Sequence, residues 1–270
     1  MNNIIGLYRR RMMMAALGSG IDVAALSITY TGAHTDYGMV TMSDGARYRL
    51  LAFTSSGTLS IEQPVNCEVC VVGGGANGTN GRGEGGAGGA GAYLKNQAVS
   101  AYNGGPVVVG AGQGVSSIAD VSVNAVSGKN GGTGAGGTTA GTGDGISKYP
   151  FEDTGYSLWA GKPHCAGGGQ GVYESVTSAG DLQGYNGGNG GTNGGNGYLR
   201  GSNKVPNPSG GAGGSYGGGD GGGHTTEGHT GRNATYYGSG AGGGGYHHPG
   251  GYYGGSGYQG IVYIRIPVIQ

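Results

Sequence analysis

A pair of cysteines at metal-ligand spacing is the first place where this sequence could do chemistry. Cys67-Glu68-Val69-Cys70 has the C-x-x-C pattern of redox pairs and of half zinc sites. It begins an apolar run, residues 67–72, that predicts a β-strand, and an odd separation within a strand places two side chains on opposite faces. The sequence has no second C-x-x-C, and its third cysteine is Cys165. These features favour ordinary strand cysteines over a metal or redox site.

Two glycine motifs resemble those of enzymes. Residues 73–78 satisfy G-x-G-x-x-G directly after an apolar strand, as in dinucleotide-binding βαβ units, which need a helix next to receive the pyrophosphate. Residues 79–86 contain too much glycine for a helix, at about 1 kcal/mol per glycine. Residues 213–217 match the G-x-S-x-G nucleophile elbow, but such a match arises by chance in a glycine-rich chain. We expect no cofactor and no enzyme activity.

The histidines do not form a standard metal motif. His247 and His248 are adjacent, and His224 and His229 precede them at spacings that match no common zinc pattern. Aromatic neighbours make surface contacts the favoured role, and no metal site is predicted.

Glycine dominates the chain, with 72 of 270 residues, most of them in runs between residues 73 and 260. Such a chain cannot build an ordinary aliphatic core, so it stays disordered or packs backbone against backbone. The 14 basic and 14 acidic residues balance, and tyrosines and apolar residues interrupt the runs, which favours an ordered fold. The neutral balance also gives no electrostatic reason to expect nucleic acid or an anionic membrane as partner.

The glycine runs predict a stack of polyglycine II helices. That conformation repeats every three residues, so glycine at two of three positions leaves one side chain per turn and lets neighbouring chains approach closely. Hydrogen bonds between chains must then compensate for the entropy lost by ordering so many glycines. Collagen is excluded because the glycines keep no strict period of three and only 8 prolines are present.

Alternating or apolar runs predict strands at both ends of the chain. We expect a mostly β fold with very little α-helix, in which the terminal strand pairs with N-terminal strands in a β-sandwich. Residues 117–125 are expected to form one strand with Ala119, Val121 and Val123 on one face. The expected strands are residues 26–30, 37–42, 47–54, 58–61, 67–72, 92–99, 107–110, 117–125 and 261–266.

Three regions follow from these patterns: residues 1–22, residues 23–126 with 257–270 as the sandwich, and residues 127–256 as the glycine stack. Arg9, Arg10 and Arg11 precede the apolar residues 12–17, as at the start of a secretory signal. That apolar stretch is short and is followed by Gly-Ser-Gly, which favours a docking segment, and no stretch reaches the roughly 20 apolar residues of a membrane span. The expected docking residues are Leu7, Tyr8, Arg9, Met12 and Met13.

Segments between the glycine runs hold most of the remaining aromatic residues and are expected to be loops on a rigid scaffold, where binding function concentrates. Aromatic side chains give large contact areas at low entropic cost. The alternative for each is packing over the glycine stack itself. The candidate binding residues are Tyr156, Trp159, Tyr173, Tyr185, Tyr236, Tyr237, His247 and Tyr252.

An ordered series of short motifs resembles the glycine-rich domains of bacteriophage tail and tail-fibre proteins. The motifs are FTSSGTL at 53–59, VCVVGGG at 69–75, GGAGAY at 88–93, VVVGAGQG at 107–114 and GYQGIVYIR at 257–265. The layout of the glycine-rich part is also similar to the tip adhesins of T-even-type long tail fibres. In those adhesins polyglycine II helices stack and variable loops contact the host surface. The N-terminal residues do not match the attachment domain of those adhesins.

This resemblance implies a non-enzymatic virion protein whose aromatic loops bind a bacterial surface glycan or outer protein. Residues 1–22 would dock onto another virion protein, a homo-oligomer such as a trimer fits the pattern, and the location would be the virion or, after release, the extracellular space. The alternative is a self-assembling coat or extracellular filament subunit, whose exposed strand edges and glycine helices pair with further copies.

Overall fold

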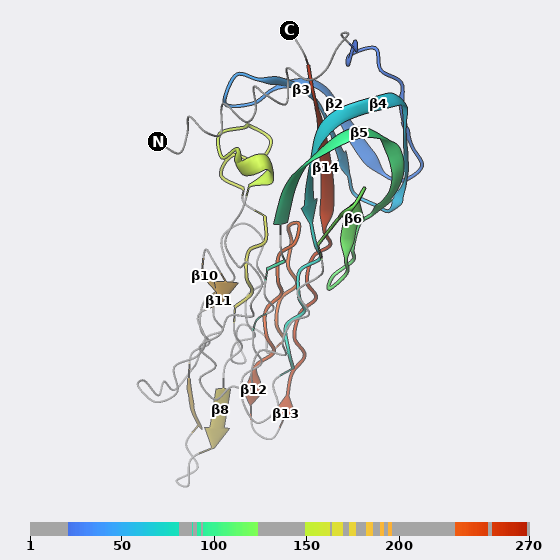
Figure 1. Ribbon diagram of the computed structural model, residues 1–270. Helices are drawn as coiled ribbons and strands as arrows, with labels where there is room; N and C mark the ends of the chain where they lie inside the picture. Colours follow the sequence, from blue (N-terminus) through green and yellow to red (C-terminus); the bar gives the residue numbers. More distant parts are fainter. Residues whose placement is uncertain are drawn as a thin grey trace.

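The first third of the chain and its last strand form one eight-stranded antiparallel sheet, seen in the upper part of Figure 1. Its order is β2-β3-β14-β4-β5-β6-β7, and β1 pairs with β4. The strands are β1 Ile28–Tyr30, β2 His34–Thr41, β3 Arg47–Phe53, β4 Gly57–Val72, β5 Leu94–Val108, β6 Ser116–Ile118, β7 Val121–Val123 and β14 Ile261–Pro267.

This computed structural model describes most of the sheet and parts of the glycine-rich region. For β8 to β13 only the backbone pairing is described. The described residues are 21–80, 88, 91–92, 94–123, 149–162, 164–169, 173–176, 182–185, 190–191, 194–195, 230–247 and 250–268.

Strand β14 lies at the centre of the sheet, between β3 and β4. Residues 261–266 are all buried, so both faces of the strand are covered. This confirms the prediction that the terminal strand pairs with the N-terminal strands. The mostly β fold is also confirmed, because the described residues contain no α-helix and only one short 3-10 turn, η1 Pro150–Glu152.

The predicted sandwich of separate sheets is instead one sheet bent around its own core. β4 and β5 are single strands of 16 and 15 residues, each of which was expected to be two strands. Their pairing shifts register between Ser60 and Cys67, and such bulges bend and twist strands. Gly104 and Gly105 have φ values of 111° and 147° in β5 opposite the start of this shift, a conformation suited to glycine.

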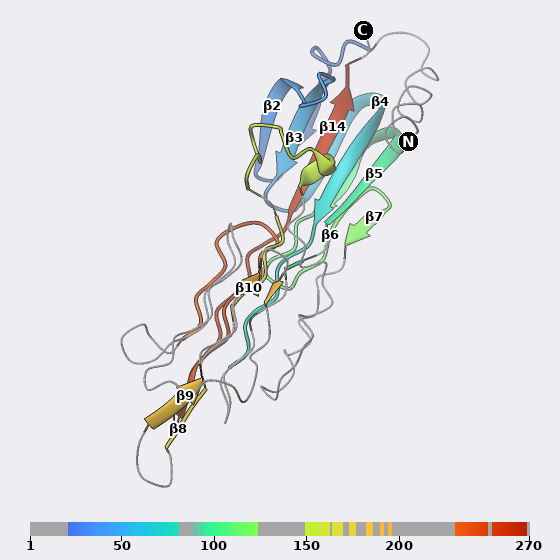
Figure 2. The same ribbon diagram turned by 90° about the vertical axis from the view of Figure 1, so that its left-hand side faces the viewer.

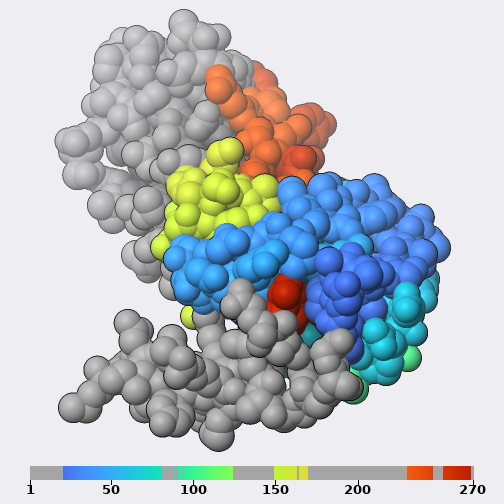
Figure 3. Space-filling model, turned by 90° about the horizontal axis from the view of Figure 1, so that it is seen from above, coloured from blue at the N-terminus to red at the C-terminus, as the bar shows by residue number. Residues whose placement is uncertain are grey.

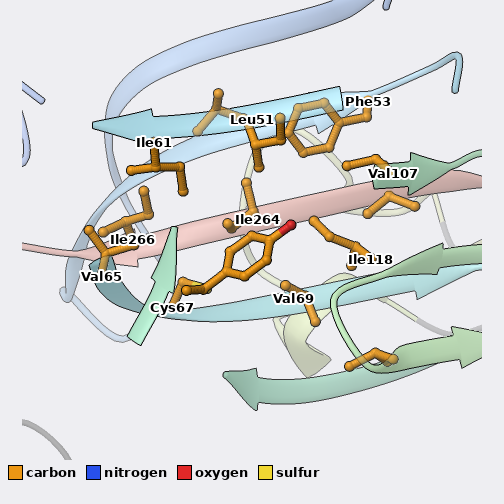
Figure 4. Packing of buried hydrophobic residues seen from close by; sticks show 14 of the residues in the cluster. Leu51, Phe53, Ile61, Val65, Cys67, Val69, Val107, Ile118, Ile264 and Ile266 are labelled. Atoms are coloured by element: carbon orange, nitrogen blue, oxygen red, sulfur yellow. The ribbon is translucent and has the colours of Figure 1, made fainter. Parts of the chain in front are cut away.

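The concave face of the bent sheet encloses an aliphatic core, and the close-up shows its side chains meeting between the surrounding strands (Figure 4). β3, β4, β5, β6, β7 and β14 all contribute, together with Val23 and Leu26. The side chains labelled in Figure 4 are Leu51, Phe53, Ile61, Val65, Cys67, Val69, Val107, Ile118, Ile264 and Ile266.

Residues 116–123 form a hairpin, which corrects the prediction of one continuous strand over residues 117–125. β6 pairs with β7 through Ile118 and Val121, and Ala119 in the turn has a φ of 51°. A two-residue turn reverses the chain there, and alternation alone does not distinguish two short strands from one long strand. Ala119 therefore does not continue the buried row of Val121 and Val123.

The opposite face of the sheet is covered by residues 149–162, which we call the strap. Phe151 and Trp159 of the strap are buried against Leu50 and Tyr263 of the sheet in a second apolar cluster. The Phe151 N–H donates to Asn96 Oδ1 at 3.0 Å. Seen from above, the strap lies between the N-terminal strands and the glycine-rich residues 230–245 (Figure 3).

A buried arginine fastens the strap to the sheet. Arg265 on β14 donates to Glu68 Oε2 at 2.6 and 3.1 Å. Its guanidinium lies 4.4 Å from the ring centre of Tyr48 and 4.3 Å from that of Phe151. The Arg265 side chain is 2% exposed and that of Glu68 30% exposed, so the carboxylate connects the buried cation to solvent.

Below the sheet, glycine-rich segments lie side by side: residues 74–80, the turn at residues 110–114, residues 165–169, residues 231–235 and 239–245, which fold back on each other, and residues 252–260 (Figures 1 and 2). Two of them lie N-terminal to the predicted boundary at residue 127. Hydrogen bonds between segments recur every three residues, the period of polyglycine II helices. The pairs that show this are Gly240 to Ala166, Gly243 to Gly169, Ala241 to Ala76 and Gly244 to Thr79.

Residues 239–244 lie at the centre of this stack. Successive residues bond to different neighbours, so one segment joins residues 76–79, residues 166–169 and residues 255–258. The segments are in such close contact that a Cβ at Gly78 or Gly168 would overlap a carbonyl oxygen of Gly242 or Ala241. Glycine is therefore required at these positions by packing.

The stack ends, on the side away from the large sheet, in a small four-stranded sheet of order β13-β12-β8-β9 (Figure 2). Its strands are β8 Tyr173–Val176, β9 Leu182–Tyr185, β12 Tyr246–His247 and β13 Gly250–Gly251. A separate pair joins β10 Gly190–Gly191 to β11 Gly194–Gly195.

Placing a methyl group at a central glycine should separate the stacked segments. We expect Gly168→Ala to lower the free energy of unfolding by about 1 to 3 kcal/mol, the usual range for overpacking. The reverse change nearby, Ala166→Gly, should cost below about 1 kcal/mol, because it only loosens the backbone. Urea unfolding followed by circular dichroism measures both. Equal losses for the two variants would contradict the packing argument.

Removing the partner of Arg265 should destabilise the sheet more than removing the whole ion pair. Glu68→Gln leaves a buried guanidinium without its carboxylate, and we expect a loss at or below the lower end of about 3 to 5 kcal/mol, because Glu68 is partly exposed. The double variant Glu68→Gln with Arg265→Met should recover part of that loss. Thermal unfolding of the two variants tests this, and a double variant less stable than the single one would contradict it.

Candidate binding surfaces

Aromatic side chains gather where the strap, the glycine stack and the large sheet meet. Three chain segments contribute: β14, the strap with the following residues 164–169, and residues 236–258. The members, which we call the junction cluster, are Tyr156, Trp159, His164, Tyr236, Tyr237, Tyr258 and Tyr263.

The inner layer of this cluster is fully buried. Trp159 packs edge-on against Tyr263 at 5.5 Å, and its Nε1–H donates to the carbonyl oxygen of Asp153 at 2.6 Å. His164 lies 5.8 Å from the Tyr263 ring, and its Nε2 lies 3.1 Å from the Tyr263 hydroxyl. Trp159 was predicted to contact a receptor, which is wrong for this fold because the indole is 0% exposed. Its role is to fix the strap.

The outer layer consists of tyrosines that are partly exposed. Tyr236 and Tyr237 pack on His164 at ring distances of 5.0 and 6.0 Å, with Tyr237 stacked nearly parallel at 19°. Tyr258 lies 5.6 Å from Tyr237. Tyr156 packs edge-on against the buried Trp159 at 4.8 Å. Tyr156, Tyr236 and Tyr237 therefore each rest on a buried neighbour and leave part of their surface to solvent.

A glycine turn sets the positions of Tyr236 and Tyr237. Gly238 has a φ of 69°, and a Cβ there would lie 2.7 Å from Val72 Cγ1 and 3.1 Å from Cys165 Sγ. Its carbonyl accepts a hydrogen bond from Ala92 at 2.7 Å, while the Tyr237 carbonyl accepts one from Cys165 at 3.1 Å. The turn is thus held by Ala92, just before β5, on one side and by Cys165, just after the strap, on the other.

The phenols of Tyr156, Tyr236, Tyr237 and Tyr263 stay protonated at neutral pH. Burial raises the pKa of Tyr156, Tyr236 and Tyr237, and neighbouring tyrosines add to this. Burial raises the pKa of Tyr263 further, because its hydroxyl is within the apolar layer. Protonated phenols donate and accept hydrogen bonds but do not act as bases at neutral pH. The cluster therefore offers ring faces and hydroxyl groups that can donate and accept hydrogen bonds.

His164 stays neutral in this environment. Burial lowers the pKa of His164 to about 3, and its Nδ1 has no hydrogen-bond partner among the described residues. Asp153 holds the strap nearby by accepting hydrogen bonds from Ser43 and Tyr156. Partial burial alone would raise the pKa of Asp153, but these bonds lower it below its usual value.

A second group of predicted residues lies at the far end of the stack. β8 pairs with β9 and β12 so that Tyr185, Tyr173 and Tyr246 occupy one row across the distal sheet. Glu174 and His247 are paired in the adjacent row. Tyr173, Tyr185 and His247 were expected in loops, and the structure places them in strands. Tyr246 was missed because its partner is about 70 residues away in the chain, joined by a parallel pairing that no local pattern indicates.

The remaining candidates lie apart from these two groups. Tyr252 follows β13, is half-buried and donates its N–H to the Gly245 carbonyl at 3.0 Å. Leu7, Tyr8, Arg9, Met12 and Met13 lie outside the described residues, as do residues 213–217, His224, His229 and His248. The structure therefore brings together Tyr156, Trp159, Tyr236 and Tyr237 in one cluster, and it places Tyr173 and Tyr185 in one row of the distal sheet with His247 in the adjacent row.

The cysteines behave as predicted for strand residues. Cys67 faces the aliphatic core and Cys70 faces the strap, which confirms that the two thiols lie on opposite faces of the sheet. Burial raises the pKa of Cys67 to about 12, so the thiol is unreactive at neutral pH. Residues 73–80, which follow the strand, are not helical, and most of the stretch 79–86 for which no helix was predicted lies outside the described residues.

Within the described part of the chain, no three histidine, cysteine, aspartate or glutamate side chains are grouped to hold a metal ion. The described residues also contain no helix that is both long and apolar enough to span a bilayer. Comparison of the chain with protein-family models, with curated proteins and with solved structures gave no match.

Because His164 is buried, the free energy of unfolding should fall as the pH drops below 6.5, at pH values above those at which carboxylates titrate. The unfolded chain binds the proton near the ordinary pKa of 6.5 and the folded chain only near 3, so stability present above pH 6.5 is lost as pH falls toward 3. The slope should approach about 1.4 kcal/mol per pH unit. His164→Gln should reduce this slope between pH 6.5 and 4.5. His34→Gln, at an exposed site, should leave the slope unchanged. Urea unfolding at several pH values provides the measurement, and an unchanged slope in His164→Gln would refute the assignment.

Proposed function

We propose that this chain is a non-enzymatic bacteriophage tail or tail-fibre protein that recognises the host cell surface. The observation that carries the proposal is the aromatic row of the distal sheet, where Tyr185, Tyr173 and Tyr246 align at the end of the glycine stack. The motif order along the chain supports the same class of protein. The protein would be located in the virion.

The scaffold suits this role because its cohesion does not depend on side chains. Hydrogen bonds between backbones hold residues 74–80, 231–245 and 252–260 together. Segments between such rods can change in sequence and length without opening a cavity in the stack. A receptor-binding surface at the end of the rods can therefore diversify while the fold is kept.

The distal sheet has the composition of an adaptable contact surface. Tyrosines supply broad contact area at low entropic cost, and three of them share one row of the distal sheet. Such a surface fits a bacterial surface glycan or an outer protein as partner. Residues 1–22 would attach the chain to another virion protein, through Leu7, Tyr8, Arg9, Met12 and Met13, and the chain could act as a trimer or other homo-oligomer.

The alternative is a subunit that assembles with itself. It is favoured by β2, an edge strand of the large sheet that pairs only with β3 among the described strands. However, the β2 pairing is interrupted between Asp36 and Met39, and Gly38 has a φ of 65°. Bulges of this kind protect sheet edges from pairing with other chains. Sedimentation velocity over a range of concentrations distinguishes discrete species from growing polymers.

Substituting the aromatic row should abolish cell binding without unfolding the protein. Labelled full-length protein is incubated with a panel of intact bacterial strains, alongside Tyr173→Ser with Tyr185→Ser, and Val115→Ser as an exposed control. We expect strain-selective binding by the wild type and control, and at least a tenfold loss in the double variant, as for interface hot spots (about 2 kcal/mol or more). Equal binding by all three proteins would refute the distal contact. No binding to any strain, with polymers in sedimentation, would favour self-assembly.

A further inference from the structure

Residues 252–260, which we call the outer segment, direct their N–H groups to three sides. The N–H groups of Tyr252, Gly255 and Tyr258 donate inward to carbonyls of residues 239–245, at 3.0, 2.8 and 2.9 Å. These donors are three residues apart, which is the repeat of a polyglycine II helix. The residues between them therefore face the two other sides of the helix, away from the centre of the stack.

On the second side, asparagine side chains accept the N–H groups of the outer segment. Gly257 donates to Asn77 Oδ1 at 2.8 Å, and Gly254 donates to Asn80 Oδ1 at 3.1 Å. The two donors and the two acceptors are each three residues apart, so each turn of the outer segment meets one asparagine. A side-chain amide oxygen has the chemistry of a backbone carbonyl, so the asparagines take the place of a neighbouring chain.

A third asparagine accepts on the remaining side. Ser256 donates its N–H to Asn233 Oδ1 at 2.7 Å, and the Ser256 carbonyl accepts a bond from the Ala234 N–H at 3.0 Å. We call the three acceptors the edge caps: Asn77, Asn80 and Asn233. All three are exposed, as is Ser256, whereas Gly255, which bonds inward, is buried. The edge caps therefore lie where the stack meets solvent.

The centre of the stack is bonded differently. Residues 239–244 donate all their N–H groups to backbone carbonyls, and all of them are buried. Without the edge caps, the outer segment would present N–H groups to solvent at the same spacing, as an open strand edge presents them to another strand. A glycine-rich chain could then bond there, because it has no side chains that prevent close approach. Every further copy of this protein carries such segments.

We propose that the edge caps close the exposed face of the glycine stack against a second copy of the chain. They occupy the outward N–H groups of Gly254, Ser256 and Gly257, so no glycine helix of another copy can extend the stack there. The inward bonds to residues 239–245 hold the outer segment in place without the edge caps, so their role concerns association more than stability. This goes beyond the proposed host contact and holds whatever the distal sheet binds.

Removing two edge caps from the full-length chain should open this face. In Asn77→Ala with Asn80→Ala, we expect the amides of Gly254 and Gly257 to exchange hydrogen with solvent faster by about fivefold or more, as measured by NMR on dilute protein. Sedimentation velocity should show species larger than those of the wild type, which grow with protein concentration. Asn77→Asp keeps an acceptor oxygen and should keep the slow exchange of Gly257.

Further variants separate this effect from general loosening and from other contacts. Asn103→Ala with Thr235→Ala, at two exposed positions outside the edge caps, is the matched control and should behave as the wild type does. A new cysteine, Ser256→Cys, should give disulfide-linked dimers in the variant without the two caps, because Ser256 lies on the opened face. Thr41→Cys, at the exposed end of the edge strand β2, should not.

Near-ultraviolet circular dichroism reports whether each variant is folded, and Asn233→Ala, which removes one cap, repeats the test if the double variant unfolds. The proposal is overturned if the folded variants exchange and sediment as the wild type does, or if the control associates equally. Crosslinks through Thr41→Cys instead of Ser256→Cys would also overturn it, in favour of association at the sheet edge. Cell binding is a separate measurement, and its loss or absence leaves this result unchanged.

Discussion

The need to pair buried backbone groups governs this molecule. A glycine-rich chain has few side chains to bury, so its N–H and C=O groups must find partners in neighbouring segments. They do so every three residues around residues 239–244. The absence of a Cβ makes such close approach geometrically feasible, and the bonds offset the high conformational entropy of glycine. The turn that carries Tyr236 and Tyr237 is joined directly to segments anchored in this way.

The large sheet and the glycine stack are built from the same continuous segments. β4 passes directly into residues 73–80, and residues 252–260 pass directly into β14. At the boundary Gly260 donates to the Gly110 carbonyl at 2.8 Å, and Gly74 donates to the Gly114 carbonyl at 3.0 Å. The strap then covers the face of the sheet nearest this boundary. Hydrogen bonding therefore continues from ladder to stack without a flexible linker, and the junction cluster lies over that continuity.

Local patterns predicted the parts of the fold that local chemistry determines. The alternating or apolar runs predicted β3 and β14. The last strand follows a long glycine-rich stretch, so the N-terminal strands were its expected partners. The glycine runs predicted backbone packing because a residue without a Cβ allows close approach of another backbone wherever it stands in the chain. The bends in β4 and β5 were missed because a bulge depends on the pairing partner, and local alternation does not distinguish a bent strand from two short ones.

The sequence indicated which types of residue form the candidate site, but it did not predict how they are arranged. Tyr156, Tyr236 and Tyr237 were chosen as aromatic residues between glycine runs, and the structure brings them together through His164 and Trp159. Burial of Trp159 depends on the strap folding over β14, a tertiary contact between residues about 100 apart. The row of Tyr173, Tyr185 and Tyr246 likewise depends on a parallel pairing across the glycine stack.

The direct passage of the chain from sheet to stack has a mechanical consequence. A pull on the distal sheet would travel along residues 73–80 and 252–260 into β4 and β14, which are antiparallel neighbours. Both strands enter the stack from the same end of the sheet, so they would be drawn the same way and would pass the load to their other neighbours, β14 to β3 and β4 to β5. The bonds of these two ladders run perpendicular to the strands, so tension along the strands loads them together in shear rather than opening them one at a time. Such an arrangement resists tension along the direction of the strands.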